Sequence, residues 1–371
     1  MTEALLVLED GTTLTGTGFG AAGEAFGEMV FNTGMTGYQE TLTDPSYCRQ
    51  IVAMTAPHIG NTGVNSEDPE SRRIWVSGYV VREPTSVASS WRATGDLDGY
   101  LRAEDIPGIA IRGTRLLTRR VREAGAMRAA ISTIEDDPAK LLQRVLQSPE
   151  MTGADLAREV STPEPYTVPA VGETKHRVAA VDLGIKASTP RNMAARGCEV
   201  RVLPATATAT DILATAPDGV FFSNGPGDPA AAQYAVDAMR GVLDAGVPVF
   251  GICLGSQILA LALGLRTYKL RYGHRGVNQP VMDLTTRRVY ITSHNHGFAA
   301  ELPDSDSSTP FETPYGLATI THVNLNDGVV EGLRLLNRPV FSVQYHPEAA
   351  PGPHDAADHF DHFCTMMAAS Q

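Results

Sequence analysis

The sequence lacks the features that mark membrane, secreted or metal-clustered proteins. Its 371 residues contain no apolar run of about eighteen residues, the length of a membrane-spanning helix, and no basic segment with an apolar core at the start. Its four cysteines lie far apart, without the CxxC spacing of a zinc site or the density of a disulfide framework. We therefore expect a cytoplasmic protein with reduced thiols.

Positive charge is scarce as well. Lysine and arginine number 30 against 42 aspartates and glutamates, which gives a net charge of -12 at pH 7. This balance argues against nucleic acid as the main partner. The hydrophobic fraction of 43% is that of an ordinary globular protein, and the length exceeds what one compact core usually holds. We expect two domains.

Residues 1–150 are rich in glycine and in short β-like segments, which predicts an N-terminal mixed α/β domain. The apolar residues 4–8 precede Asp10-Gly11, a strong hairpin signal. Further apolar or amphipathic segments predict strands or helices at residues 51–55, 75–81, 114–122 and 138–147. Residues 151–174 are rich in proline and poor in apolar pairs, so we expect the interdomain connection there.

Residues 175–371 alternate between predicted strands and predicted helices. The apolar segments that predict strands are residues 178–182, 199–203, 219–223 and 247–250, and those that predict helices are residues 189–196, 230–244 and 258–263. Strands separated by helices of this length predict a doubly wound, mainly parallel sheet. Such sheets hold their sites at the carboxyl ends of the strands.

The heptapeptide Gly251-Ile252-Cys253-Leu254-Gly255-Ser256-Gln257 lies between a predicted strand and a predicted helix. Its glycines permit a turn too tight for a β-carbon, and such a turn pushes the central side chain out over the sheet edge. The pattern is typical of a nucleophile elbow with cysteine as nucleophile. A small buried cysteine in an ordinary turn is the alternative, and the partners found later in the chain favour the nucleophile.

His346 and Glu348 are the candidate partners of Cys253. They follow the β-like run 340–345, and Pro347 between them favours extended backbone. Residues two apart in an extended segment face the same side, so the Glu348 carboxylate can orient the His346 ring. A catalytic cysteine needs such a base and such an orienting group. Alone, His-Pro-Glu would indicate a surface loop.

Two further segments contribute polar groups. Residues 223–229 form a rigid turn of glycine and proline after a strand, able to aim backbone N–H groups at an oxyanion. This turn lacks the lysine and the spacing of a phosphate-binding loop. Residues 291–298 are polar and follow a predicted strand. Their two histidines, His294 and His296, have no third ligand at convincing spacing, so we expect no metal site.

These segments resemble the class I, triad-type glutamine amidotransferase domain. The whole chain is similar to the small subunits of glutamine-dependent carbamoyl-phosphate synthase, and the motifs that carry this narrower resemblance are residues 31–40, 43–47, 57–61 and 351–357. The resemblance runs from about residue 4 to the tail.

The resemblance implies specific roles. Cys253 attacks the glutamine carboxamide and forms a γ-glutamyl thioester, His346 moves the protons, and Glu348 orients His346. The residues implied in holding glutamine are Ser46, Gly225, Gly227, Leu254, Gln257, Asn295, Gly297 and Phe298. The backbone N–H groups of Leu254 and Gly225 are the implied oxyanion donors.

The resemblance also implies a partner. A separate large subunit would use ATP and magnesium to make carbamoyl phosphate from bicarbonate and ammonia, for arginine and pyrimidine biosynthesis, while this chain would form a heterodimer with it and carry no cofactor. Two alternatives stay open: the amidotransferase component of another pathway, or a catalytically inactive scaffolding subunit. Three positions depart from the family pattern, namely Gly34, Gly113 and Ser256.

Overall fold

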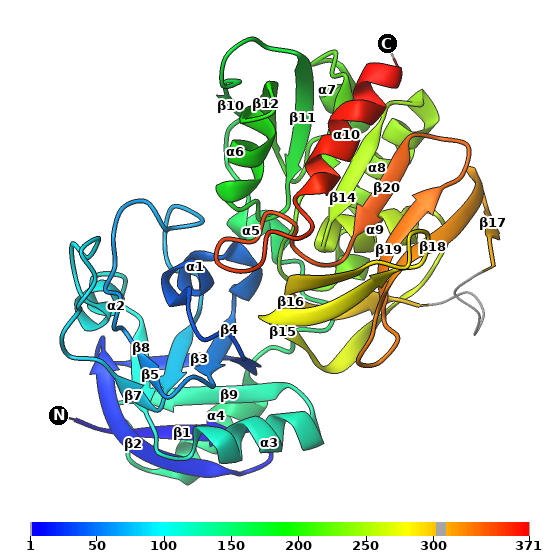
Figure 1. The fold of residues 1–371 in the computed structure, drawn as a ribbon. Helices are drawn as coiled ribbons and strands as arrows, with labels where there is room; N and C mark the ends of the chain where they lie inside the picture. The colour runs from blue at the N-terminus through cyan, green and yellow to red at the C-terminus, as the bar shows by residue number, and fades with distance from the viewer. Residues whose placement is uncertain (1, 302–308, 371) are drawn as a thin grey trace. The chain divides into compact units, whose positions relative to one another are not determined.

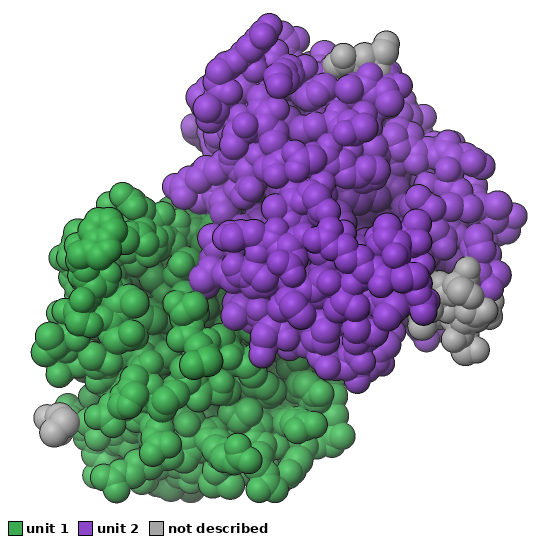
Figure 2. All heavy atoms as spheres, viewed as in Figure 1, with its two compact units in different colours: residues 1–151, 271–276 green, residues 152–270, 277–371 purple. Residues whose placement is uncertain are grey.

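The computed structural model describes residues 2–301 and 309–370, and the chain forms two compact units. Unit 1 comprises residues 1–151 and 271–276, and unit 2 comprises residues 152–270 and 277–371 (Figure 2). Each unit buries its own apolar clusters. The short piece 271–276 lies within strand β15 (Thr267–Asp283), so a single strand contributes residues to both units.

Unit 1 is built on a closed barrel. Within the described residues its strand order is β1-β2-β8-β6-β4-β3-β9. These strands are β1 (Thr2–Leu8), β2 (Thr13–Gly20), β3 (Glu24–Asn32), β4 (Gln50–Met54), β6 (Gly78–Val81), β8 (Pro107–Ala110) and β9 (Met127–Ser132). The predicted hairpin at Asp10-Gly11 is confirmed, because β1 and β2 pair antiparallel across it. Closure leaves no open edge in this sheet.

Short helices and a small two-stranded sheet complete unit 1. They are α1 (Tyr38–Thr43), η1 (Pro45–Tyr47), α2 (Leu97–Ala103), α3 (Thr114–Ala124) and α4 (Pro138–Gln147), with β5 (His58–Ile59) and β7 (Glu83–Pro84). Helix α4 begins where the sequence predicts, because Asp137 accepts hydrogen bonds from the first free amides and Pro138 suits the first helical position. Helix α3 starts at Gly113, which provides no side-chain cap.

Unit 2 is a large mixed sheet in the order β10-β12-β11-β13-β14-β20-β19-β18-β15-β16, with β17 paired to β18 (Figure 1). Its strands other than β15 are β10 (Tyr166–Val168), β11 (His176–Asp182), β12 (Cys198–Pro204), β13 (Gly219–Phe222), β14 (Val249–Ile252), β16 (Val289–Ala300), β17 (Phe311–Thr313), β18 (Gly316–Asn324), β19 (Val330–Leu335) and β20 (Val340–Val343). The run β12-β11-β13-β14-β20 is parallel throughout. This confirms the predicted mainly parallel sheet.

Helices cover both faces of the parallel part, as the doubly wound prediction requires. The helices of unit 2 are α5 (Ala157–Val160), α6 (Ser188–Ala194), α7 (Ala209–Leu213), η2 (Pro229–Ala231), α8 (Gln233–Ala245), α9 (Leu254–Ala262) and α10 (Asp358–Ala369). Apolar residues of α7, α8 and α9 form one core with the sheet, and those of α6 and α10 form the other. Gly219 lies where α10 packs, because a β-carbon there would meet Phe363 and Met367.

Two segments differ from their sequence-based description. Residues 291–298 lie inside β16 and not after a strand, and most of their polar side chains are buried. Residues 151–174 contain α5 and β10, and β10 pairs with β12 at the edge of the unit 2 sheet. Among the described residues, no helix has the length and apolar character needed to cross a membrane.

Candidate active site

Cys253 occupies a strained turn between β14 and α9. Its backbone has φ 54 and ψ −103, a conformation that L side chains rarely adopt, and its amide donates to the Val343 carbonyl of β20 at 2.9 Å. Strain of this kind costs about 1–3 kcal/mol and persists only where the surroundings impose it. The predicted elbow is therefore present in the backbone itself.

The glycines around Cys253 are required by close backbone packing. A β-carbon on Gly251 would lie 2.8 Å from the Gly255 carbonyl oxygen, and one on Gly255 would collide with the Phe222 carbonyl of β13. Gly225 likewise lies directly against the Leu183 carbonyl. The chain can make this turn, next to the neighbouring strand ends, only with hydrogen as the side chain.

His346 and Glu348 interact directly. The Nδ1 atom of His346 lies 2.7 Å from Oε1 of Glu348, and both side chains are buried. Because Nδ1 donates to the carboxylate, Nε2 is the ring atom left to take or give a proton. The backbone amide of His346 donates to the Ser293 carbonyl at 2.9 Å, which ties the end of β20 to β16.

Lys186 completes this group, and sequence reasoning missed it. Its Nζ lies 2.7 Å from Oε1 of Glu348, and its side chain is only 6% exposed. A buried lysine needs an anionic partner, which Glu348 supplies. One signal was available: Lys186 follows β11, and polar residues after a strand of a parallel sheet gather at its carboxyl edge.

The charges in this group are strongly coupled. Burial and the Lys186 ammonium lower the pKa of His346, but Glu348 and Cys253 outweigh them and raise it to about 10. Burial raises the pKa of Glu348, but Lys186 and His346 together lower it to about 2. At neutral pH Glu348 is thus ionised, and the imidazolium form of His346 is favoured. An imidazolium beside a sulfur is the arrangement that nucleophilic cysteine chemistry needs.

Strand β16 runs beside Cys253. The Cys253 sulfur lies 3.7 Å from the Asn295 carbonyl oxygen. The side-chain amide of Gln257 donates to the Phe298 carbonyl at 2.7 Å and to Gln344 Oε1 at 3.0 Å. The side-chain amide of Gln257 therefore links α9 to β16 and to the segment that follows β20.

The two residues predicted to supply oxyanion donors, Leu254 and Gly225, lie close to each other. Leu254 is the first residue of α9, so its N–H has no acceptor within the helix. Gly225 follows β13, and a β-carbon at Gly225 would come within 2.9 Å of the Leu254 side chain. Their role as oxyanion donors stays a prediction. Gly227, with φ 92, lies in the same turn, and a β-carbon there would meet the backbone of Leu156.

The remaining sequence-predicted residues are distributed as follows. Gly297 lies in β16 between the buried His296 and Phe298. Ser46 lies in η1 of unit 1, where its amide donates to the Asp44 side chain at 2.9 Å, and its role in glutamine binding stays a prediction. Ser256, one of the departures, shares a hydrogen bond of 2.9 Å with Ser342 of β20.

His294 and His296 belong to a buried hydrogen-bonded network. Nδ1 of His294 lies 3.1 Å from Nε2 of His296, and Nε2 of His294 lies 2.8 Å from the Thr292 hydroxyl. The sequence offered no third group, but the fold brings the Glu331 carboxylate within 3.6 Å of His294. Asn324 donates to the same carboxylate at 3.1 Å. The network flanks Asn295 and fixes the strand that carries it.

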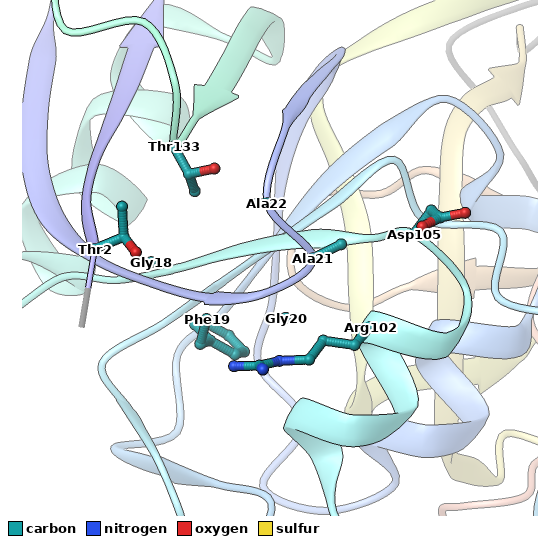
Figure 3. A pocket seen from close by; sticks show the side chains of 9 residues that line it. All are labelled: Thr2, Gly18, Phe19, Gly20, Ala21, Ala22, Arg102, Asp105 and Thr133. Atoms are coloured by element: carbon teal, nitrogen blue, oxygen red, sulfur yellow. The ribbon is translucent and has the colours of Figure 1, made fainter.

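A surface hollow of about 410 Å³ lies elsewhere, in unit 1 (Figure 3). It is lined mostly by small residues at the end of β2. Its one cationic side chain, Arg102, is 63% exposed and paired with Asp98 at 2.9 Å. None of the groups described around Cys253 lines it.

Comparison with known proteins matches this arrangement. Residues 179–366 match the family model for glutamine amidotransferase class-I, so unit 2 is a class I glutamine amidotransferase domain. Residues 6–131 match the model for the carbamoyl-phosphate synthase small chain, CPSase domain.

Full-length relatives agree. The chain is 62% identical over 368 residues to the carbamoyl phosphate synthase small chain of Streptomyces coelicolor, covering 99% of this chain and 96% of that one. It is 55% identical over 375 residues to the corresponding small chain of Mycobacterium tuberculosis, covering 99% of each. The chain belongs to the carbamoyl-phosphate synthase small-chain family.

Proposed function

We propose that this chain hydrolyses glutamine to glutamate and ammonia and delivers the ammonia to a large synthetase subunit that forms carbamoyl phosphate. The observation that carries this proposal is the strained backbone of Cys253 beside a buried His346–Glu348 pair. Strain that is kept at a single buried thiol, next to a base with its orienting carboxylate, supports nucleophilic catalysis.

The first half of the reaction forms the thioester. His346 holds a proton at Nε2 as an imidazolium beside the Cys253 sulfur, while Glu348 accepts the hydrogen bond from Nδ1 and stabilises that charge. The sulfur then attacks the glutamine carboxamide carbon. The negative charge that develops on the oxygen is received by the backbone N–H groups of Leu254 and Gly225. As the tetrahedral intermediate collapses, His346 gives its proton to the departing ammonia.

The second half returns the enzyme to its starting state. His346, now neutral, takes a proton from water, and the resulting hydroxide attacks the thioester carbonyl. The same two amides stabilise the second oxyanion, and glutamate leaves as the Cys253 sulfur is released. Lys186 assists by keeping Glu348 ionised through both halves, since its ammonium lowers the pKa of that carboxyl.

Glutamine recognition is assigned to groups close to the elbow. We propose that Gly225, Gly227 and Leu254 line the carboxamide end, and that Asn295, Gly297 and Phe298 of β16 border the bound molecule. We assign Gln257 a positioning role, because its side-chain amide is bonded to β16 and to the segment that follows β20. Ser46 is proposed to hold the α-amino and carboxylate end.

The rest of the proposal concerns partners and place. The N-terminal domain is proposed to contact the large subunit, which would bind ATP and magnesium and supply the synthetase steps. The pair would form a heterodimer serving arginine and pyrimidine biosynthesis. A cytoplasmic location fits a thiol nucleophile, which must stay reduced.

The test measures two activities in one mixture. The chain and its large subunit are assayed for carbamoyl phosphate formation with glutamine or with ammonium chloride as nitrogen source. Cys253→Ala should lose glutamine-dependent synthesis by at least about a thousandfold, as loss of a nucleophile usually does. It should keep ammonia-dependent synthesis. Cys364→Ala, which changes a partly exposed cysteine of α10, is the matched control and should keep both.

Other outcomes would contradict the proposal. Glutamine-dependent synthesis that survives Cys253→Ala would mean that the nucleophile is misassigned. Wild-type protein that releases no ammonia from glutamine, with or without the large subunit, would favour a scaffolding role.

A further inference from the structure

Two cysteines outside the catalytic site lie side by side in unit 2. The sulfur atoms of Cys198 and Cys364 are 3.6 Å apart. Cys198 is the first residue of β12 and is fully buried, whereas Cys364 lies in α10 and is partly exposed. The contact therefore joins the start of an inner strand to the helix at the end of the chain.

We propose that Cys198 and Cys364 form an oxidisable dithiol, which a hydroperoxide converts to a disulfide that ties α10 to β12. This site is separate from Cys253 and does not depend on the proposed glutaminase reaction. The partly exposed Cys364 sulfur reacts with the oxidant first. The buried Cys198 sulfur then attacks the oxidised Cys364 and forms the disulfide.

Two cations, Arg196 and Lys175, lie near the pair, and Arg196 is paired with the Asp361 carboxylate. Arg196, two residues before Cys198, bonds through Nε to Asp361 Oδ1 at 2.8 Å and through Nη2 to Asp361 Oδ2 at 3.1 Å. Asp361 and Cys364 are three residues apart in α10, so they lie on the same face of that helix. The stem of Lys175 lies against Gly197, since a β-carbon there would be 3.1 Å from it. Cations beside a partly exposed cysteine favour its reactive thiolate form.

The two thiols have different acidities in this setting. The hydrogen bond with Cys198 lowers the pKa of Cys364, and Arg196 and Lys175 lower it further, against the opposing effects of burial and of the Asp361 carboxylate. The same hydrogen bond and burial raise the pKa of Cys198. Cys364 is therefore the sulfur that presents a thiolate to an oxidant.

The chemistry balances with a hydroperoxide as oxidant. The Cys364 thiolate attacks the peroxide, an S–O bond forms, the O–O bond breaks, and hydroxide or alkoxide leaves. The Cys198 sulfur then attacks the Cys364 sulfenic acid, so the S–S bond forms and the S–O bond breaks. The leaving hydroxide takes the Cys198 proton and becomes water. With hydrogen peroxide, two thiols yield one disulfide and two waters.

The geometry needs only a local adjustment. A disulfide holds its sulfurs about 2.05 Å apart, so the pair must close by about 1.5 Å, which side-chain rotation and a small shift of α10 can provide. No partner chain or second copy is needed, because both thiols belong to the same core.

A disulfide at Cys364 would restrain helix α10, which packs against the strands that precede the proposed catalytic residues. Phe360 and Phe363 contact the ring of Phe250 in β14 at centroid distances of 5.9 Å and 5.7 Å. His359 Nε2 lies 2.7 Å from the hydroxyl of Tyr345, the neighbour of His346. A covalent tie at Cys364 would hold this whole packing surface in place.

The first test uses the full chain with Cys253→Ala, which removes the catalytic thiol as a competing target. The reduced protein is treated with hydrogen peroxide, alkylated and digested for peptide mass analysis. We expect Cys198 and Cys364 to lose alkylation together and to appear in one cross-linked peptide lighter by two hydrogen atoms, reversible by dithiothreitol. Cys48, which is buried in unit 1, serves as the internal control and should remain alkylated.

Single substitutions separate the two roles. In Cys198→Ser, Cys364 should accumulate sulfenic acid that dimedone traps. In Cys364→Ser, Cys198 should stay reduced. Oxidation of Cys364 to sulfinic acid in the unsubstituted dithiol without any cross-link, or equal loss of all thiols including Cys48, would overturn the proposal.

Thermal unfolding tests the stabilising effect. The oxidised dithiol should unfold about 5 °C or more above the reduced form, because the cross-link restricts the unfolded chain. In Cys364→Ser, peroxide should give no such rise. If the oxidised protein unfolds at or below the unfolding temperature of the reduced protein, the disulfide does not stabilise the fold. If a variant fails to fold, the peptide analysis of the protein with both cysteines present still decides whether the disulfide forms.

Discussion

The backbone conformation of Cys253 predicts how the stability of two variants should differ. The comparison separates the effect of backbone strain from the effect of losing the cysteine sulfur. At φ 54 and ψ −103, any residue with a β-carbon is strained, and glycine is not. Replacing Cys253 by alanine removes the sulfur and keeps the strain. Replacing it by glycine removes both. The two variants should be equally inactive as glutaminases and should differ in stability.

The expected magnitude follows from two opposing terms. Relief of the strain contributes about 1–3 kcal/mol in favour of glycine. Glycine also makes the unfolded chain more flexible, which costs about 0.4–1 kcal/mol. Cys253→Gly should therefore be about 1 kcal/mol more stable than Cys253→Ala. Both variants lack the sulfur, so the cost of its loss cancels in this comparison.

The matched control is Cys198 in the same unit. It is a buried residue of strand β12, where the backbone is extended and unstrained. There glycine should be about 0.5–1 kcal/mol less stable than alanine, as in other strand interiors. The assay is calorimetric unfolding of the four variants under reducing conditions. If the glycine-minus-alanine difference has the same sign at Cys253 as at Cys198, the elbow is not strained and the reasoning fails.

Three further predictions concern the same unit and its controls. Gly255→Ala should destabilise the protein by about 3 kcal/mol or more, because the new β-carbon meets a backbone carbonyl of β13, whereas Gly113→Ala, whose nearest neighbour would be 3.9 Å away, should change stability by less than about 0.5 kcal/mol in urea unfolding. Lys186→Met should cost about 3–5 kcal/mol and most of the glutaminase activity, because it removes one of the two cations that balance the buried Glu348 carboxylate. The exposed Lys140→Met should cost under about 0.5 kcal/mol, and equal effects would refute the importance of burial. The lowering of the Glu348 pKa from 4.5 to about 2 makes its contribution to stability, about 3 kcal/mol, present above pH 4.5 and lost as the pH falls toward 2. The stability gap between wild type and Glu348→Gln should shrink over that interval, and a gap that is constant with pH would contradict it.

Much of the candidate site could be predicted because its signals are local in the sequence. The elbow is a strand, a tight turn and a helix within a few residues, and its glycines are visible without any tertiary knowledge. His346 and Glu348 are two residues apart, and an extended backbone is enough to bring their side chains together. The alternation of strands and helices likewise predicted the parallel sheet of unit 2.

Contacts between distant segments could not be read in this way. Lys186 reaches Glu348 only because β11 and β20 end at the same edge of one sheet. No local sequence pattern predicts the order of the strands in that sheet. The segment 291–298 was expected after a strand, and its place inside β16 follows from pairing with partners elsewhere in the chain. The same holds for Glu331, which the fold brings to His294.

The sequence alone predicted a nucleophile, a base and an orienting carboxylate, because the turn at Cys253 and the pairing of His346 with Glu348 each lie within a few residues. Only the tertiary structure decided which charge balances Glu348, which carbonyls force glycine at the elbow, and that Cys198 meets Cys364. These contacts join residues that are far apart in the sequence, so they depend on the order in which the strands pair. The packing energy of the whole sheet selects that strand order.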